Sequence, residues 1–195
     1  VCSSDLTSAA AATLTINVSS GTYVYGSTLA ANSGAITGAV SLVKSGNGTQ
    51  ELGDINTYNG TTTINGGLLK VNGSIGSSAV TVNNGGALGG SGTTGSVTVN
   101  ANATLSPGNS PGTLTTGAMS LNGGGNYNWQ LYDANGTQGT GWDFINSTGA
   151  LTINATLGNA FNVNLWTLSG TGPDVNGPAL NFNAASNRTW KIGTF

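Results

Sequence analysis

The chain has 195 residues, of which four are basic, six are acidic and thirty-three are glycine; histidine is absent and Cys2 is the one cysteine. So few basic residues argue against nucleic acid or an anionic membrane surface as a partner. The missing histidine and the lone cysteine exclude His-based general base catalysis, histidine metal ligands, an internal disulfide and a thiolate cluster. No apolar stretch approaches the roughly 18 residues that a spanning helix needs, so we expect no membrane insertion by this segment.

The first six residues read VCSSDL. Read back into codons, GTG TGC TCT TCC GAT CT is the end of a common sequencing adapter. We therefore interpret residues 1–6 as an adapter scar and exclude them from the fold. On this interpretation the remaining chain is a piece of a longer reading frame, and its anchor lies outside the segment.

A four-residue pattern, apolar or Thr, Thr, apolar, Asn, recurs along the chain. The copies are LTIN (14–17), TTIN (62–65), VTVN (80–83), VTVN (97–100) and LTIN (151–154), with a degenerate copy, LTTG, at 114–117. From Asn65 the pattern advances by 18, 17 and 17 residues to Gly117. Because apolar residues alternate with Thr, each copy predicts a short strand with one apolar and one polar face.

Each of the central copies is followed by an Asn/Gly-rich corner and a second short apolar run, which includes Leu69, Leu88 and Leu105 in turn. Two strands per unit of about 17 residues predict one coil of a solenoid. Val82 should then lie on Val99 in adjacent parallel strands. We expect the LSPGNSPGTL stretch (105–114) to be a corner between Leu105, in the second strand of one coil, and Leu114, in the first strand of the next.

Antiparallel hairpins in a β-sandwich are the alternative, since alternation and Gly-rich turns fit them as well. The sameness of the units favours a solenoid, because stacking equivalent coils rewards Val on Val and Asn on Asn at every step. A helical fold is disfavoured by the Thr, Asn, Gly and β-branched composition.

Residues 45–117 closely resemble the autotransporter-associated β-strand repeat of bacterial surface proteins. The resemblance rests on NTYNGTTTINGGLLKVNG (56–73), GGALGGSGTTGSVTV (85–99) and LSPGNSPGTL. It implies an all-β, right-handed parallel β-helix, exported as part of a passenger stalk and located outside the cell or at the outer-membrane surface. We assign residues 7–125 to these repeats. Residues 126–195 resemble the segment found after such repeats in proteins with a carboxy-terminal sorting signal, and we assign them to a C-terminal aromatic β continuation or cap.

Four acids are candidates for catalytic groups, since some β-helix proteins act on polysaccharides through clustered carboxylates: Glu51, Asp54, Asp133 and Asp143. Solvated corner positions are the preferred interpretation, and no catalytic residue is assigned. Asp133, Asn135 and Asp143 form a weak calcium candidate, since Ca²⁺ favours hard oxygen ligands. An Asx-type turn at Asp133 and a structural corner at Asp143 are favoured over it.

All four tryptophans lie in the last third of the chain, at Trp129, Trp142, Trp166 and Trp190. We expect them to close the core of the last coils, because an open solenoid end exposes unpaired strand edges. Stacking on sugar rings is the alternative. The Thr-rich faces also resemble those of ice-binding solenoids, but Thr does not recur regularly enough to favour that function.

The function expected from the sequence is a structural, non-enzymatic stalk segment of an exported bacterial surface protein, without a cofactor. A glycan- or surface-binding adhesin is the first alternative and a β-helix polysaccharide-active enzyme the second. The partners expected are surface glycans or neighbouring repeats of the same chain.

Overall fold

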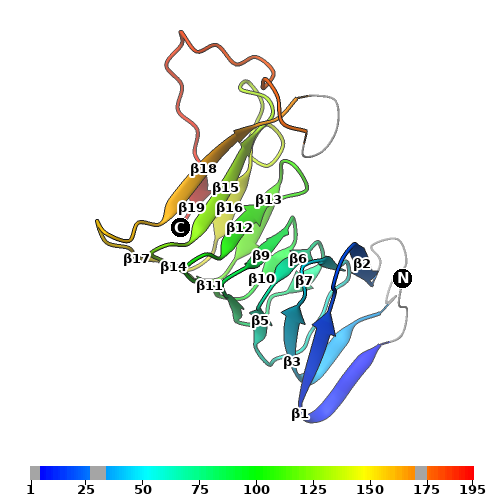
Figure 1. The fold of residues 1–195 in the computed structure, drawn as a ribbon. Coiled ribbons are helices and arrows are strands. Elements are labelled where there is room, and N and C mark those ends of the chain that lie inside the picture. Colours follow the sequence, from blue (N-terminus) through cyan, green and yellow to red (C-terminus); the bar gives the residue numbers. More distant parts are fainter. Residues whose placement is uncertain (1–4, 27–33, 170–174) are drawn as a thin grey trace.

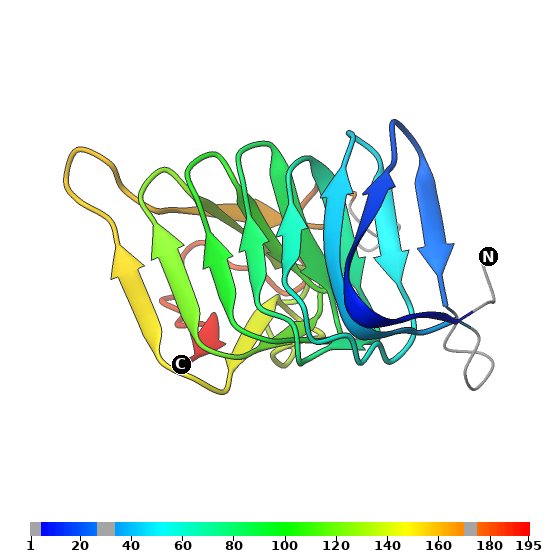
Figure 2. The ribbon, with the colours of Figure 1, turned by 90° about the horizontal axis from the view of Figure 1, so that it is seen from below.

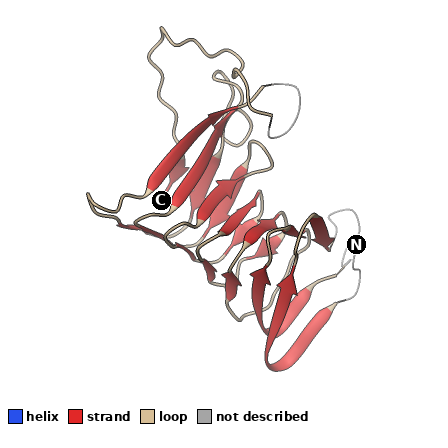
Figure 3. Ribbon diagram, in the orientation of Figure 1, coloured by secondary structure: helices blue, strands red, loops and turns tan. Residues whose placement is uncertain are grey.

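A computed structural model describes residues 5–26, 34–169 and 175–195 of the chain. These residues form strands, turns and loops without a helix (Figure 3). The strands make three parallel sheets that wind along a rod, with β1 at one end and β17 and β18 at the other (Figure 1). The predicted parallel β-helix is therefore confirmed. Residues 1–4 of the proposed adapter scar lie outside the described residues, and the assignment of residues 1–6 stays a prediction.

Sheet 1 contains all five undegenerate copies of the repeated tetrapeptide. Its strands, in spatial order, are β1 (Leu6–Asn17), β3 (Ile36–Ser45), β5 (Thr62–Ile64), β8 (Val80–Val82), β11 (Val97–Val99), β14 (Met119–Asn122) and β17 (Leu151–Asn154). Val82 pairs with Val99 in parallel register, as predicted. Both valines are buried, whereas Thr81 and Thr98, which precede them, are partly exposed; this is the alternation that a strand imposes.

Sheet 2 contains the second apolar run of each coil. Its strands are β2 (Thr22–Tyr25), β4 (Thr49–Leu52), β6 (Gly67–Val71), β9 (Gly86–Gly90), β12 (Thr104–Pro107), β15 (Asn126–Leu131) and β18 (Asn162–Thr167), in that order across the sheet. Leu69, Leu88 and Leu105 stack in register and are fully buried. They form part of one continuous core between the sheets.

Sheet 3 is a difference from the sequence prediction, which gave two strands to each coil. Its strands are β7 (Ser74–Ile75), β10 (Thr93–Thr94), β13 (Thr113–Thr116), β16 (Phe144–Ser147) and β19 (Gly193–Thr194). Two of the strands that lie inside the repeats, β7 and β10, span only two residues each, which is too short for an alternating pattern to be recognised. Figure 2 shows the successive coils of the chain side by side along the rod.

The prediction for the degenerate copy LTTG (114–117) is wrong about its sheet. Leu114 lies in β13 of sheet 3 and pairs with Ile145. The first strand of the next coil in sheet 1 is β14, whose Met119 and Leu121 pair with Val97 and Val99. Alternation shows which face of a strand is apolar but does not show to which sheet the strand belongs, so TLTT and VTVN look alike in the sequence.

The corner LSPGNSPGTL joins two strands of one coil. Leu105 lies in β12 of sheet 2, as predicted, but Leu114 lies in β13 of the same coil and not in the first strand of the next. The chain turns through Gly108 (φ 86°) and Ser110 (φ 77°), which both take the left-handed conformation. The side-chain amide of Asn109 donates to Asn72 Oδ1 at 2.9 Å, which ties this corner to an earlier coil.

The last third of the chain extends the same rod. Of the strands after residue 125, β17 joins sheet 1, β15 and β18 join sheet 2, and β16 and β19 join sheet 3. Leu180 and Arg188 lie beside the loop that follows β15, and the chain then reaches β19, which pairs with β16 (Figure 1). The aromatic residues of this region thus gather where the rod ends.

Candidate functional site

Asp143 is a buried acid at the centre of the C-terminal region. Its side chain has no exposed surface. Oδ1 accepts a hydrogen bond from the backbone N–H of Gly112 at 2.9 Å, and Oδ2 accepts one from Gln130 N–H at 3.0 Å. The carboxylate therefore connects the residue just before β13 to the C-terminal part of β15. Both oxygens accept from backbone donors, which is the geometry of a structural corner.

Trp129 is tied to the same acid. The Trp129 indole N–H donates to the backbone oxygen of Asp143 at 2.8 Å, and the Trp129 side chain is buried. Its ring centroid lies 6.1 Å from that of Trp190, with the rings tilted. Tyr127, two residues earlier in β15, donates its hydroxyl to Ile192 O. Burial and, next, the negative charge of Asp143 raise the pKa of Tyr127.

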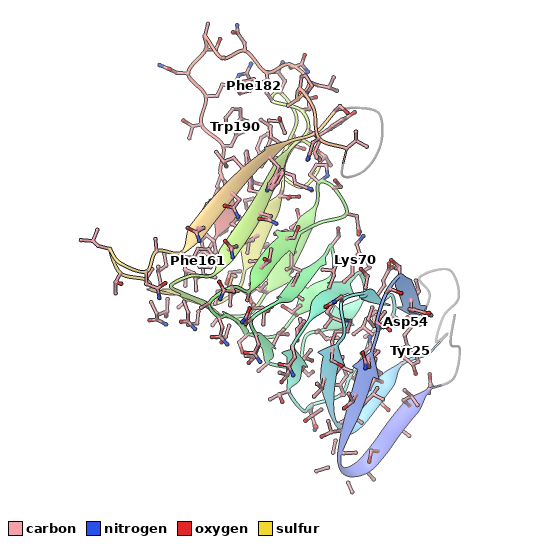
Figure 4. All side chains as sticks on the ribbon, in the orientation of Figure 1. Tyr25, Asp54, Lys70, Phe161, Phe182 and Trp190 are labelled. Carbon is pink, nitrogen blue, oxygen red and sulfur yellow. The ribbon has the colours of Figure 1, made fainter. Side chains whose placement is uncertain are left out.

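The four tryptophans divide into two groups. Trp129 is buried, Trp142 and Trp190 are half-buried and pack against the core, and Trp142 donates its indole N–H to Lys191 O. Phe182 stacks on Trp190 at 6.3 Å between centroids, and both are labelled near the end of the rod in Figure 4. Trp166 alone of the four is exposed, at 44%. Three of the rings thus fill or cover the core and one faces outward.

Two of the calcium candidates, Asp133 and Asn135, lie in the loop after β15, and each has its own hydrogen-bond partners. Asp133 Oδ1 accepts hydrogen bonds from Asn135 N–H at 2.9 Å and from Asn181 Nδ2 at 2.7 Å. The bond from Asn135 is the Asx-type turn that the sequence favoured. Arg188 donates one hydrogen bond to Ala134 O and another to Asn135 Oδ1.

This arrangement fastens the segment around Asn181 and Arg188 to the loop. The hydrogen bonds from Asn181 and Asn135 hold the pKa of Asp133 below its usual value. The other two candidate ligands have different partners. Asn135 Oδ1 accepts from the guanidinium of Arg188, and the carboxylate of Asp143 accepts from two backbone N–H groups. In the described part of the chain, no group of three or more His, Cys, Asp or Glu residues is arranged to hold a metal ion.

The two acids near the other end of the rod are also engaged by amides. Glu51 Oε1 accepts from Asn72 Nδ2 at 2.8 Å, and Asp54 Oδ1 accepts from Ile55 N–H at 3.2 Å. Asn72 in turn accepts from Asn109, so the Glu51 contact is one link in a polar network beside sheet 2. Each of these two carboxylates is thus bonded to an amide N–H of its own surroundings.

A buried lysine is the feature that sequence reasoning missed. Lys44 lies in β3, faces the core and has no exposed surface. Its Nζ donates to Ser45 O at 2.8 Å, Gly46 O at 2.9 Å and Gly66 O at 3.0 Å, so all three ammonium hydrogens have an acceptor. Burial lowers the pKa of Lys44. The ammonium group of Lys44 thus binds backbone carbonyl groups in two successive corners of the rod, one at residues 45–46 and the other at Gly66.

An asparagine ladder runs along one edge of sheet 1. Each side-chain Nδ2 donates to the Oδ1 of the preceding coil: Asn83 to Asn65 and Asn100 to Asn83 at 2.8 Å, Asn122 to Asn100 at 2.8 Å, and Asn154 to Asn122 at 3.0 Å. The expected stacking of Asn on Asn is confirmed. The ladder has one direction, with donors pointing toward the N-terminal end of the rod.

The family comparison matches the early coils of the rod. Residues 42–71 match the model of the passenger-associated-transport-repeat. This confirms the resemblance found in the sequence, and it covers Lys44 together with β4, β5 and β6. The repeat associates the segment with the passengers of exported bacterial surface proteins. A search of curated proteins found no match. Among the described residues, no helix is long and apolar enough to cross a membrane.

Proposed function

We propose that this segment is a non-enzymatic stalk that holds other parts of an exported surface protein away from the cell. The observation that carries the proposal is the unbroken stacking of coils in register, from β1 to β17 in sheet 1 and from β2 to β18 in sheet 2. Each added coil lengthens such a rod by about 4.8 Å. Asp143, Glu51 and the buried Lys44 bind backbone groups or amides, so these charges serve cohesion.

Deletion of one whole coil tests the stalk. Removing residues 66–83 from the full-length surface protein joins Asn65 to Asn84 and leaves every remaining strand in its own sheet. We expect normal display of a terminal epitope tag, normal protease resistance and a rod shorter by about 4.8 Å. Removing residues 66–74 instead is the control, since it takes out only the sheet 2 strand and part of the sheet 3 strand and should expose the rod to proteases. Loss of a polysaccharide-cleaving activity on whole-coil deletion, with display intact, would contradict the proposal.

A glycan-binding adhesin is the second candidate, and one surface favours it. On the outer face of sheet 2, Trp166 pairs in register with Gln130, and Asn164 Nδ2 donates to Asn128 Oδ1 at 3.0 Å beside them. An exposed indole with neighbouring amides offers a sugar ring both a stacking surface and hydrogen bonds. Trp166→Ala should abolish glycan-array binding without loss of folding. An unchanged array signal would remove this candidate.

A further inference from the structure

Eight asparagines of the chain are followed directly by glycine, at Asn47, Asn59, Asn65, Asn72, Asn84, Asn122, Asn135 and Asn176. In such a pair the backbone nitrogen of the glycine can attack the side-chain amide carbon of the asparagine, because glycine has no Cβ to hinder the approach. A glycine N–H that is bound to an acceptor has to leave it before the attack, which slows the reaction. The hydrogen bonds of the eight glycines therefore rank the eight pairs by reactivity.

Seven of the eight glycines use their N–H in a backbone hydrogen bond. The acceptors, at 2.8–3.2 Å, are Val18 O for Gly48, Val40 O for Gly60, Leu52 O for Gly73, Asn102 O for Gly85, Asn154 O for Gly123, Asp133 O for Gly136 and Thr167 O for Gly177. Within residues 5–26, 34–169 and 175–195, the N–H of Gly66 makes no hydrogen bond. Gly66 lies in the corner between β5 and β6, in the interior of the rod's length (Figure 1). Hydrogen bonding thus separates Asn65–Gly66 from the other pairs.

The side chain of Asn65 is also placed for attack. It is exposed, and its Oδ1 accepts a hydrogen bond from Asn83 Nδ2 at 2.8 Å. Attack on Cγ puts negative charge on Oδ1, and a donor already directed at that oxygen stabilises the charge. Asn65 is the first asparagine of the ladder, and its own Nδ2 makes no hydrogen bond to the described part of the chain. Loss of that Nδ2 therefore breaks no contact.

The buried ammonium of Lys44 favours the same nitrogen. Its Nζ donates to Gly66 O at 3.0 Å, in the residue whose nitrogen would attack. The attacking form of this nitrogen is the deprotonated amide, which is an anion. A positive charge held close to it at a buried position stabilises an anion more strongly than the same charge in water would.

Asn122–Gly123 is an internal comparison, since Asn122 is also a ladder asparagine followed by glycine. Here the Gly123 N–H is bound to Asn154 O at 3.2 Å, and Asn122 Nδ2 donates to Asn100 Oδ1 at 2.8 Å. Conversion of Asn122 to an acid would break that ladder bond and set a carboxylate against Asn100 Oδ1. A carboxylate at position 65 would instead keep Asn83 as its donor, in a hydrogen bond strengthened by charge.

We propose that Asn65–Gly66 is a self-modification site, at which the folded rod converts Asn65 to an acid without an enzyme. Gly66 N forms a bond to Asn65 Cγ, the Cγ–Nδ2 bond breaks, and Nδ2 leaves as ammonia with the proton that Gly66 N gives up. Water then adds to a carbonyl of the cyclic imide, and the bond from that carbonyl to Gly66 N breaks as the nitrogen regains a proton. The product is aspartate or isoaspartate, with a negative charge at the start of the ladder. This modification goes beyond the role of a stalk.

Incubation of the 195-residue chain at mildly alkaline pH, in water enriched in the heavy oxygen isotope, tests the proposal. Peptide mapping by mass spectrometry then counts the heavy oxygen gained at each asparagine, which excludes conversion before the incubation. We expect Asn65 to convert about 5–10-fold faster than any of the other seven, since only its glycine has no hydrogen bond to release. In denaturant, where this difference is lost, the eight pairs should convert at similar rates.

Gly66→Ala is the control variant. An added Cβ would meet Gly46 O at 3.4 Å, which is an ordinary contact, so the fold should be kept, as checked by circular dichroism. The new side chain should slow conversion at Asn65 and leave the rates at the other seven pairs unchanged. Asn65→Asp, which carries the aspartate product, should melt at the temperature of the wild type.

Three results would overturn the proposal. The first is a second Asn–Gly pair that converts as fast as Asn65 in the folded wild-type chain, a comparison that does not depend on any variant. The second is an Asn65 that stays unmodified in the folded chain over the time in which the denatured chain converts. The third is an unchanged rate at Asn65 in folded Gly66→Ala.

Discussion

Replacing Asp143 with alanine is the sharpest test of what holds the C-terminal coils together. The change removes the acceptors that Asp143 gives to the buried N–H group of Gly112 and the part-buried N–H group of Gln130. A buried donor left unpaired costs about 1–3 kcal/mol, so the two together should lower the free energy of unfolding by about 4 kcal/mol. In a chain of this size each kcal/mol lowers the melting temperature by about 2–4 °C, which predicts a fall of about 8–16 °C.

A graded series of substitutions separates the two hydrogen bonds. Asp143→Asn keeps one acceptor oxygen and sets an amide NH₂ against the other donor, so it should lie between wild type and alanine, with a loss of about 2 kcal/mol. Urea unfolding followed by tryptophan fluorescence is a suitable assay, because the indole of Trp129 donates to Asp143 O and reports on this corner directly. Asp133→Ala, in the exposed loop nearby, is the matched control and should cost much less.

A loss below about 1 kcal/mol for Asp143→Ala would refute the proposed role of the carboxylate, since this is less than one unpaired buried donor costs. Equal losses for Asp143→Ala and Asp133→Ala would refute it as well. Either result would mean that the backbone of the corner finds other acceptors and that the carboxylate is not needed to join β13 to β15.

Three further changes test the interior and the ladder. Lys44→Met keeps the apolar stem but removes the ammonium donor from Gly46 O and Gly66 O, whereas Ser45 O keeps the N–H of Val18, so it should cost about 2 kcal/mol at neutral pH. Since burial lowers the folded pKa of Lys44, the unfolded chain binds the extra proton; the contribution of Lys44 to stability should therefore rise as the pH climbs toward 10.5, which is measured as a growing difference between the urea midpoints of the wild type and the Met variant. Burial raises the pKa of Tyr58, so the wild type should lose stability above pH 10.0, where the unfolded phenol ionises first; Tyr58→Phe should lose less in alkaline urea titrations, and equal losses would contradict the assignment. Asn100→Ala breaks one ladder bond in each direction and should cost about 1–2 kcal/mol in thermal unfolding, whereas Asn100→Asp should cost more, because a carboxylate would face the Oδ1 of Asn83.

The parts of the fold that the sequence predicted depend on neighbours within a few residues. Val80, Thr81 and Val82 alternate in sequence and therefore alternate between core and surface. The Asn/Gly corners after each strand set a coil length, and the near-constant step between copies then puts Val82 on Val99. Local alternation and a regular step are sufficient for two of the three sheets.

The rest of the fold depends on contacts between distant residues. The ladder step is 17 residues from Asn83 to Asn100 but 22 from Asn100 to Asn122, because the corner around Pro107 and Pro111 and the longer β13 lengthen that coil. A repeat search at constant spacing therefore stops at Gly117 and misses β14. Sheet 3 leaves hardly any trace in the sequence, since β7 and β10 bury one side chain each.

The charged residues were the least predictable part of the site. Lys44 looks like a surface residue in VSLVKSGNG, and its burial depends on a carbonyl of Gly66, 22 residues further along. Asp143 looks like one acid of an exposed loop, and its burial depends on N–H groups 31 and 13 residues away. The signal that could have pointed to Lys44 is its spacing from Leu42, since residues two apart on a strand face the same side.

Stacking of equivalent coils also determines where the rod is weakest. Each interior coil is covered on both sides, but β17 and β18 are covered on one side only, and Ile153 and Leu165 are exposed in consequence. In a solenoid, stability is a sum of coil and neighbour terms, so the terminal coil has one neighbour term fewer than the others. The aromatic cluster of Trp129, Trp190 and Phe182 covers part of this end, while the edges of sheets 1 and 2 stay open.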